Sequence, residues 1–183
     1  MNLSRVAERY YARYREILST MTLAMTTTLE TDSVSHNFIV QMIPHHQAAV
    51  EMAQNLLQYT TCLPLQELAD RIIVEQTQGI ETMQDALPDC GRPQNTETEL
   101  ARYAARYRRI TETMFARMGA ACESANPNVG FLRQMLPHHE GAVEMARNAL
   151  RLPVCEALRP TLCSIIDTQS RQIHEMRMLL RCL

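Results

Sequence analysis

The sequence predicts an all-α protein built of tandem antiparallel helical bundles, and three observations lead to that fold class. The stretch QMIPHHQAAVEMAQNLL at residues 41–57 recurs as QMLPHHEGAVEMARNAL at residues 134–150, an offset of 93 residues. Apolar side chains recur every three or four residues along most of the chain, as on one face of a helix. Strand signals are scarce, since the chain has 5 Gly, few alternating runs and no hairpin dipeptides.

The repeat divides the chain into two copies of one helical unit. The match needs no gap from about Tyr10 onward, and the richest cluster of helix-breaking residues lies between the copies at residues 88–93. We therefore predict a first helical repeat at residues 1–91 and a second at 92–183. The spacing leaves open whether the copies form two separate bundles or one shared bundle.

The first helix of each copy carries an apolar stripe and a recognisable start. Residues 4–29 predict a helix in which Tyr10, Tyr14 and Ile17 share one face. Its counterpart begins at a capping box, in which the Thr96 hydroxyl and the Glu99 carboxylate satisfy each other's backbone amides.

The second helix of each copy passes through a proline. It begins near residues 32–33 and, in the second copy, at Asn126, which caps a helix whose first position is Pro127. Pro44 and Pro137 each remove one backbone donor, so we expect a kink before the paired histidines. The third helix begins around Pro64 and again around Pro160.

Composition and charge exclude several classes of function. The 183 residues contain no Lys, and 18 basic against 20 acidic side chains leave a net charge of −2. Nucleic acid and anionic bilayer surfaces are therefore poor partners. No apolar stretch is long enough to predict a membrane span, and residues 1–20 do not predict a secretion signal.

Methionine and histidine are the unusual components, at 12 and 6 residues. On a helix, Met42, His45 and Met52 share one face, and His46 lies about 100° further round. The first helix adds a methionine pair spaced by four residues. The candidate metal ligands of the two copies are Met42, His45, His46, Met52, Met21 and Met25, and then Met135, His138, His139, Met145, Met114 and Met118.

This donor set favours a soft metal. Thioether sulfur has no proton to lose and selects Cu(I), or Ag(I) as its mimic, while imidazole extends the choice to Cu(II). A carboxylate-bridged di-iron site needs a Glu three residues before a His, and His45, His46, His138 and His139 lack it.

Packing alone also explains a methionine stripe. This alternative is strongest for three pairs of equivalent methionines, which are Met21 with Met114, Met25 with Met118, and Met83 with Met176. His36, His174 and Met178 occur in one copy only and are expected at the surface or rim.

The stretches FIVQMIPHHQAAVEMA at residues 38–53 and FLRQMLPHHEGAVEMA at residues 131–146 carry a family resemblance. They resemble the signature of the domain of unknown function 305 family, whose copper-related members include CopM-type copper-binding proteins. The resemblance implies a ferritin-like helical bundle and metal roles for Met42, His45, His46, Met52 and their counterparts. It also implies a location outside the cytoplasm, which the absence of a secretion signal in this chain leaves unsettled, so a cytoplasmic location stays open.

Six cysteines without a C-x-x-C motif do not make a disulfide scaffold. In antiparallel bundles Cys62 and Cys90 fall at opposite ends. If a disulfide forms, we expect either Cys122 with Cys182 or Cys155 with Cys163.

The sequence thus predicts a copper-binding protein for sequestration, resistance or transfer to a protein partner. It shows no paired carboxylates, activated nucleophile or phosphate loop, so no enzyme activity is expected. Two alternatives remain: a ferritin-like metal-dependent oxidase, and an interaction module whose methionine-rich helix face packs on a partner helix.

Overall fold

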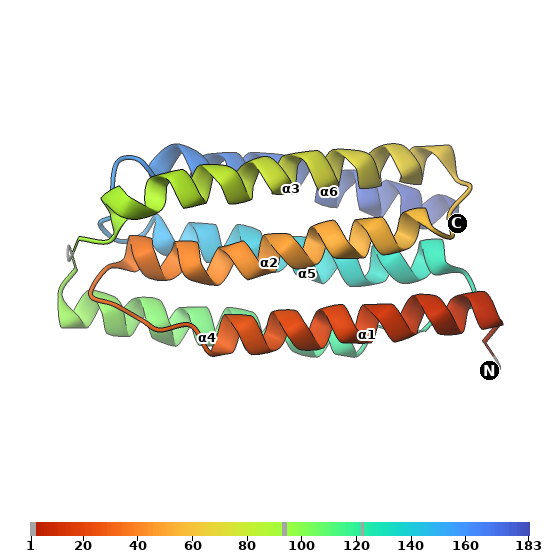
Figure 1. The fold of residues 1–183 in the computed structure, drawn as a ribbon, viewed down its shortest axis with the longest axis horizontal. Coiled ribbons are helices and arrows are strands. Elements are labelled where there is room, and N and C mark those ends of the chain that lie inside the picture. The colour runs from red at the N-terminus through yellow and green to blue at the C-terminus, as the bar shows by residue number, and fades with distance from the viewer. Residues whose placement is uncertain (1–2, 93–94, 122) are drawn as a thin grey trace.

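The computed structural model describes residues 3–92, 95–121 and 123–183. Within these residues the chain forms six helices in which consecutive members run in opposite directions (Figure 1). They are α1 (Arg5–Thr26), α2 (Val34–Leu57), α3 (Leu63–Cys90), α4 (Glu97–Gly119), α5 (Pro127–Ala149) and α6 (Arg159–Cys182). The predicted all-α helical bundle is confirmed, while its ferritin-like relation stays a prediction.

The helices lie in three layers of two. Helices α1 and α4 form one outer layer, α3 and α6 form the other, and α2 and α5 lie between them (Figure 1). Helix α2 packs against α1, α3 and α5, and helix α5 packs against α4, α6 and α2. The two copies therefore share one assembly that is joined mainly through the central pair α2 and α5.

Local capping explains where several helices begin. The Ser33 hydroxyl accepts a hydrogen bond from the His36 amide at the start of α2. At the start of α4, Thr96 and Glu99 form the predicted capping box. Helices α2 and α5 continue through Pro44 and Pro137. The expected kink at these prolines stays a prediction.

Helix α3 extends into the cluster of helix-breaking residues between the two copies. Helix α3 continues through Pro88 and ends at Cys90, so part of the breaker cluster at residues 88–93 is helical. A proline in the last turn removes only one intrahelical hydrogen bond, and the short remaining stretch tolerates that loss. Pro93 lies outside the described residues.

Buried tyrosines of the outer layer connect the two copies. The Tyr10 hydroxyl donates to Gln134 Oε1 at 2.7 Å, and its counterpart Tyr103 donates to Gln41 Oε1 at 2.7 Å. Burial raises the pKa of both phenols well above the usual value, so both remain protonated donors at neutral pH. Each tyrosine thus donates to the equivalent glutamine of the other copy, a reciprocal arrangement that indicates approximate twofold symmetry between the copies.

The disulfide pairing expected from the sequence is wrong for Cys155. Cys155 pairs with Cys90, with Cα atoms 5.5 Å apart, while Cys62, Cys163 and Cys182 are free thiols. Separate bundles would keep Cys90 and Cys155 apart, but the shared assembly brings the end of α3 to the loop before α6. Cys122, the other half of the second expected pair, lies outside the described residues.

Candidate metal centre

A stacked histidine pair occupies the interface between the central helices. The rings of His45 on α2 and His138 on α5 have centroids 3.6 Å apart and planes inclined by 28°. His45 Nε2 lies 3.2 Å from the His138 carbonyl oxygen, and His138 Nε2 lies 3.1 Å from the His45 carbonyl oxygen. Because a carbonyl oxygen only accepts, these partners assign the hydrogen of each ring to Nε2 and leave a lone pair on Nδ1.

The four paired histidines each carry a buried Nδ1 atom that forms no regular hydrogen bond among the described residues, although, against the larger effect of burial, a contact with the Met42 backbone raises the pKa of His46. They are His45, His46, His138 and His139, and each side chain is exposed by 2% or less. A buried polar atom without a partner is uncommon because it costs free energy. A lone pair on an imidazole nitrogen is also the group that coordinates a metal, so this donor set fits a bound ion.

Burial keeps these imidazoles neutral. It lowers the pKa of His46 to about 3 and the pKa of His139 to about 4. The pKa values of His45 and His138 also lie well below the usual value, first through burial and then through the neighbouring imidazoles. At neutral pH a metal ion would therefore displace no proton if it bound these rings.

The stacked geometry decides how the central histidines would share metal. The lone pair of an imidazole nitrogen lies in the plane of its ring, and two stacked rings direct their lone pairs along nearly parallel planes. His45 and His138 therefore cannot direct both Nδ1 lone pairs at one ion while they remain stacked. The arrangement favours one site in each repeat.

His139 and His46 have different neighbours although they occupy equivalent positions. His139 Nε2 donates to Gln172 Oε1 at 2.7 Å, and Gln172 Nε2 donates to Glu75 Oε2 at 2.7 Å. In the repeat alignment the counterpart of Gln172 is Gly79. A Cβ atom at Gly79 would lie 2.9 Å from His46 Cδ2 and 3.0 Å from His46 Nε2, so the His46 ring lies directly against the α3 backbone.

Every methionine predicted as a ligand lies in the interior. These residues are exposed by 2% or less: Met21, Met25, Met42, Met52, Met114, Met118, Met135 and Met145. Met83 and Met176 are equally buried, whereas Met178 and His174 are exposed. The prediction that Met178 and His174 lie at the surface is confirmed.

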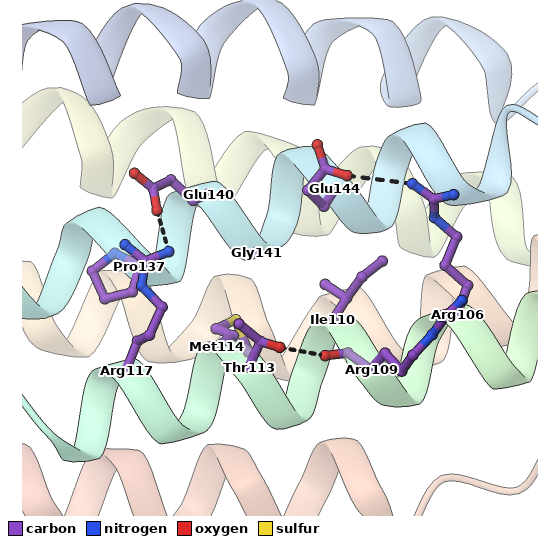
Figure 2. Close-up of a pocket in the computed structure, with 10 residues that line it drawn as sticks. All are labelled: Arg106, Arg109, Ile110, Thr113, Met114, Arg117, Pro137, Glu140, Gly141 and Glu144. Carbon is purple, nitrogen blue, oxygen red and sulfur yellow. Dashed lines mark hydrogen bonds and ion pairs between the residues drawn. The ribbon is translucent and has the colours of Figure 1, made fainter.

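Met114 packs against α5 where the helix lacks a side chain. A Cβ atom at Gly141 would overlap the Met114 sulfur, so glycine allows the thioether to reach the α5 backbone. Two ion pairs that join α4 to α5, Arg117 with Glu140 and Arg106 with Glu144, lie on either side of this contact (Figure 2). The first copy has Ala48 in place of Gly141.

Two pockets reach candidate ligands from the surface. A pocket of about 540 Å³ between α4 and α5 borders Met114 (Figure 2). Another of about 410 Å³ lies between α3 and α6 and borders His46. The pocket beside His46 is also lined by the buried side chains of Gln76 and Gln169, which no sequence pattern singled out because only the packing of α3 against α6 brings them together.

Among the described residues, no three side chains of His, Cys, Asp or Glu converge as a metal cluster. A metal site here with more than two protein ligands would need groups of other kinds beside these imidazoles, of which methionine sulfur is the nearest in sequence. None of the helices in the described part of the chain is long and apolar enough to cross a membrane.

The fold and the buried donors define a class: a duplicated all-α protein whose two repeats each carry adjacent histidines and methionines on a central helix. Residues 8–87 and residues 35–180 match the family described as Domain of unknown function (DUF305). The chain belongs to this family. No curated protein and no solved structure matches the chain.

Proposed function

We propose that the protein binds copper as Cu(I), with one ion in each repeat, and serves to sequester the metal or pass it on. The observation that carries the proposal is the unpartnered Nδ1 lone pair of His45, His138 and His139, beside the buried ring of His46, on the two helices that also carry Met42, Met52, Met135 and Met145. A soft, uncharged donor set of this kind suits Cu(I) and Ag(I) better than hard divalent ions.

The proposed roles follow from the positions of the residues. In the first repeat the donors are Met42, His45, His46 and Met52, with Met21 and Met25 available from the packed helix α1. In the second repeat they are the counterparts of these residues, with Met114 and Met118 available from α4. Copper is the cargo in this proposal, and no catalytic step is assigned to the chain.

A location in an oxidising compartment belongs to the same proposal. The Cys90–Cys155 disulfide joins the two repeats, and disulfides persist mainly in such compartments. Thioethers also remain usable there as soft ligands, whereas free thiols oxidise or pair. The partner in this proposal is a protein that delivers or accepts Cu(I).

Chelator competition under anaerobic conditions tests the proposal. Cys62, Cys163 and Cys182 are free, so they and Cys122 are first changed to Ser to remove thiol binding. We expect the Met42→Leu/Met135→Leu variant to bind Cu(I) at least about tenfold more weakly than this parent protein, because one thioether is lost from each site.

Met83→Leu/Met176→Leu is the matched control, since it removes two equally buried methionines that are not assigned as ligands. It should retain the parent affinity. The proposal is wrong if the parent protein does not compete with the chelator, or if both double variants weaken binding to the same extent.

The two alternatives gain no specific support. The methionines that would form an interaction surface lie in the interior, and the described residues contain no cluster of carboxylates and histidines for an oxidase site.

A further inference from the structure

The two pockets that reach candidate ligands differ in charge. The pocket beside Met114 is lined by three arginines, Arg106, Arg109 and Arg117, against Glu140 and Glu144. The pocket beside His46 has Glu75 in its lining, and no arginine borders it among the described residues. A positively charged ion is therefore attracted to the pocket beside His46 more than to the other pocket.

The walls of the pocket beside His46 carry polar groups that lack partners within the described part of the protein. Gln76 and Gln169 are buried, and the Oε1 atom of each has no hydrogen-bond partner among the described residues. Unpartnered amide oxygens inside a protein are costly unless a donor or a cation meets them. At about 410 Å³ the pocket also has room for a side chain of another molecule.

In the second repeat a side chain fills the equivalent position beside the histidine. Gln172 takes the position that Gly79 holds in the first repeat, and its side chain lies against His139 and is anchored by Glu75. The counterpart of Glu75 in the second repeat is Thr168, which also lines the pocket beside His46. Because position 79 is a glycine, the His46 ring lies against the α3 backbone and borders the pocket. In the second repeat the Gln172 side chain covers His139.

We propose that the pocket between α3 and α6 is the exchange port of the first repeat, through which Cu(I) and the donor group of its delivering or accepting molecule reach the Nε2 edge of the His46 ring, which faces Gly79. This inference rests on the copper-binding function proposed above. The incoming group is a thioether, imidazole or thiolate that contacts the ion before the protein's ligands release it. The first repeat therefore exchanges its ion quickly and the second repeat retains its ion.

Metal-free protein allows a test that does not depend on copper. Diethyl pyrocarbonate modifies accessible neutral imidazoles, and peptide mapping gives the rate at each site. His46 should react faster than His139, and Gly79→Gln should reduce its rate to that of His139. The exposed His174 serves as an internal reference that no variant should change.

Transfer kinetics test the port in the loaded protein. Cu(I)-loaded protein mixed with excess bicinchoninate should release its metal in a fast and a slow phase of equal amplitude. Gly79→Gln should slow the fast phase at least about tenfold, and Gln172→Gly should accelerate the slow phase. Thr77→Gln, which places the same side chain on the exposed face of α3, should behave like the parent protein.

Several results overturn the port. The first is equal modification rates of His46 and His139, and the second is a fast release phase that Gly79→Gln leaves unchanged. The third is the loss of one bound ion in Gly79→Gln, which would make Gly79 part of the metal site. If Gly79→Gln does not fold, Ser164→Phe narrows the same pocket from α6 and Gln172→Gly still tests the second repeat. Failure of the parent protein to hold Cu(I) would instead refute the proposed function, and the modification rates would still decide whether His46 is accessible.

Discussion

His46 and His139 occupy equivalent positions in the two repeats, yet their surroundings differ at their outer edges. His139 is held by Gln172, and Gln172 is held by Glu75. His46 lies against the backbone of Gly79 and borders a pocket. The comparison teaches that the repeats share the buried histidines of the central helices and differ in the outer helices that cover those histidines.

The shared part of the two repeats is extensive. Asn55 Nδ2 donates to the Tyr10 carbonyl at 3.0 Å, and Asn148 Nδ2 donates to the Tyr103 carbonyl at 3.1 Å. The stacked His45 and His138 contact each other through reciprocal hydrogen bonds. These matched contacts fix α1 on α2 and α4 on α5, and they keep the central helices paired.

The largest expected effect comes from acid, which acts on both repeats together. Each buried histidine has a folded-state pKa below its unfolded value of about 6.5, so between these two values the unfolded chain binds more protons than the folded chain. The contribution of these neutral histidines to the free energy of unfolding is fully present well above pH 6.5. It falls as the pH decreases, by about 2 kcal/mol per histidine at pH 5. Urea unfolding of metal-free protein at pH 7 and pH 5 measures this loss.

His46→Gln and His139→Gln should each reduce that acid sensitivity by a similar amount, because both rings are neutral and buried. A stability that stays constant from pH 7 to pH 5 would contradict the account of the buried imidazoles.

The next largest effect concerns the disulfide, which has no symmetric counterpart. Cys90 aligns with Leu183, whereas Cys155 aligns with the free Cys62. The Cys90→Ser/Cys155→Ser variant should lose about 4 kcal/mol of unfolding free energy, from the entropy of closing a loop between residues 65 apart. Cys182→Ser, at an exposed free thiol, is the control and should change little. Non-reducing peptide mapping that finds Cys90 alkylated would refute the pairing.

A smaller loss of stability is expected at the position where the two repeats differ, which is Gln172 in the second repeat and Gly79 in the first. Gln172→Leu should cost about 1–3 kcal/mol, since it leaves a buried His139 Nε2 hydrogen without an acceptor. Gly79→Ala should cost less, because displacement of the His46 ring is offset by about 1 kcal/mol of improved helix propensity. Thermal melting of both variants checks the order, and the reverse order would mean that the His139 contact does not stabilise the fold.

The smallest expected loss of stability concerns the two equivalent tyrosines whose hydrogen bonds join the repeats. Tyr10→Phe and Tyr103→Phe should each cost about 1 kcal/mol, because each removes one buried hydrogen bond of equal length. Denaturant unfolding should give the same loss for both. A clear difference between them would show that the tyrosines do not join the repeats equivalently.

Local signals made most of the fold predictable. The capping box at Thr96 and the serine at position 33 mark helix starts through contacts within a few residues. The spacing of Met42, His45 and Met52 predicted one helix face, and all three side chains are buried. Whether these side chains bind metal stays a prediction.

The remaining features depend on contacts between distant segments. The stacking of His45 on His138 and the pairing of Cys90 with Cys155 arise because α2 packs on α5, which no local pattern specifies. The contrast between Gly79 and Gln172 is visible in the repeat alignment. Its meaning appears only once α3 and α6 are placed against the histidines.

X-ray absorption at the copper edge tests the central claim most directly. The sample is Cu(I)-loaded protein with Cys62, Cys122, Cys163 and Cys182 changed to Ser. The account predicts two ions per chain, each with both imidazole nitrogen and thioether sulfur in its coordination shell, and a weaker sulfur signal after Met42→Leu/Met135→Leu. A shell of nitrogen and oxygen alone, or no retained copper, would contradict it.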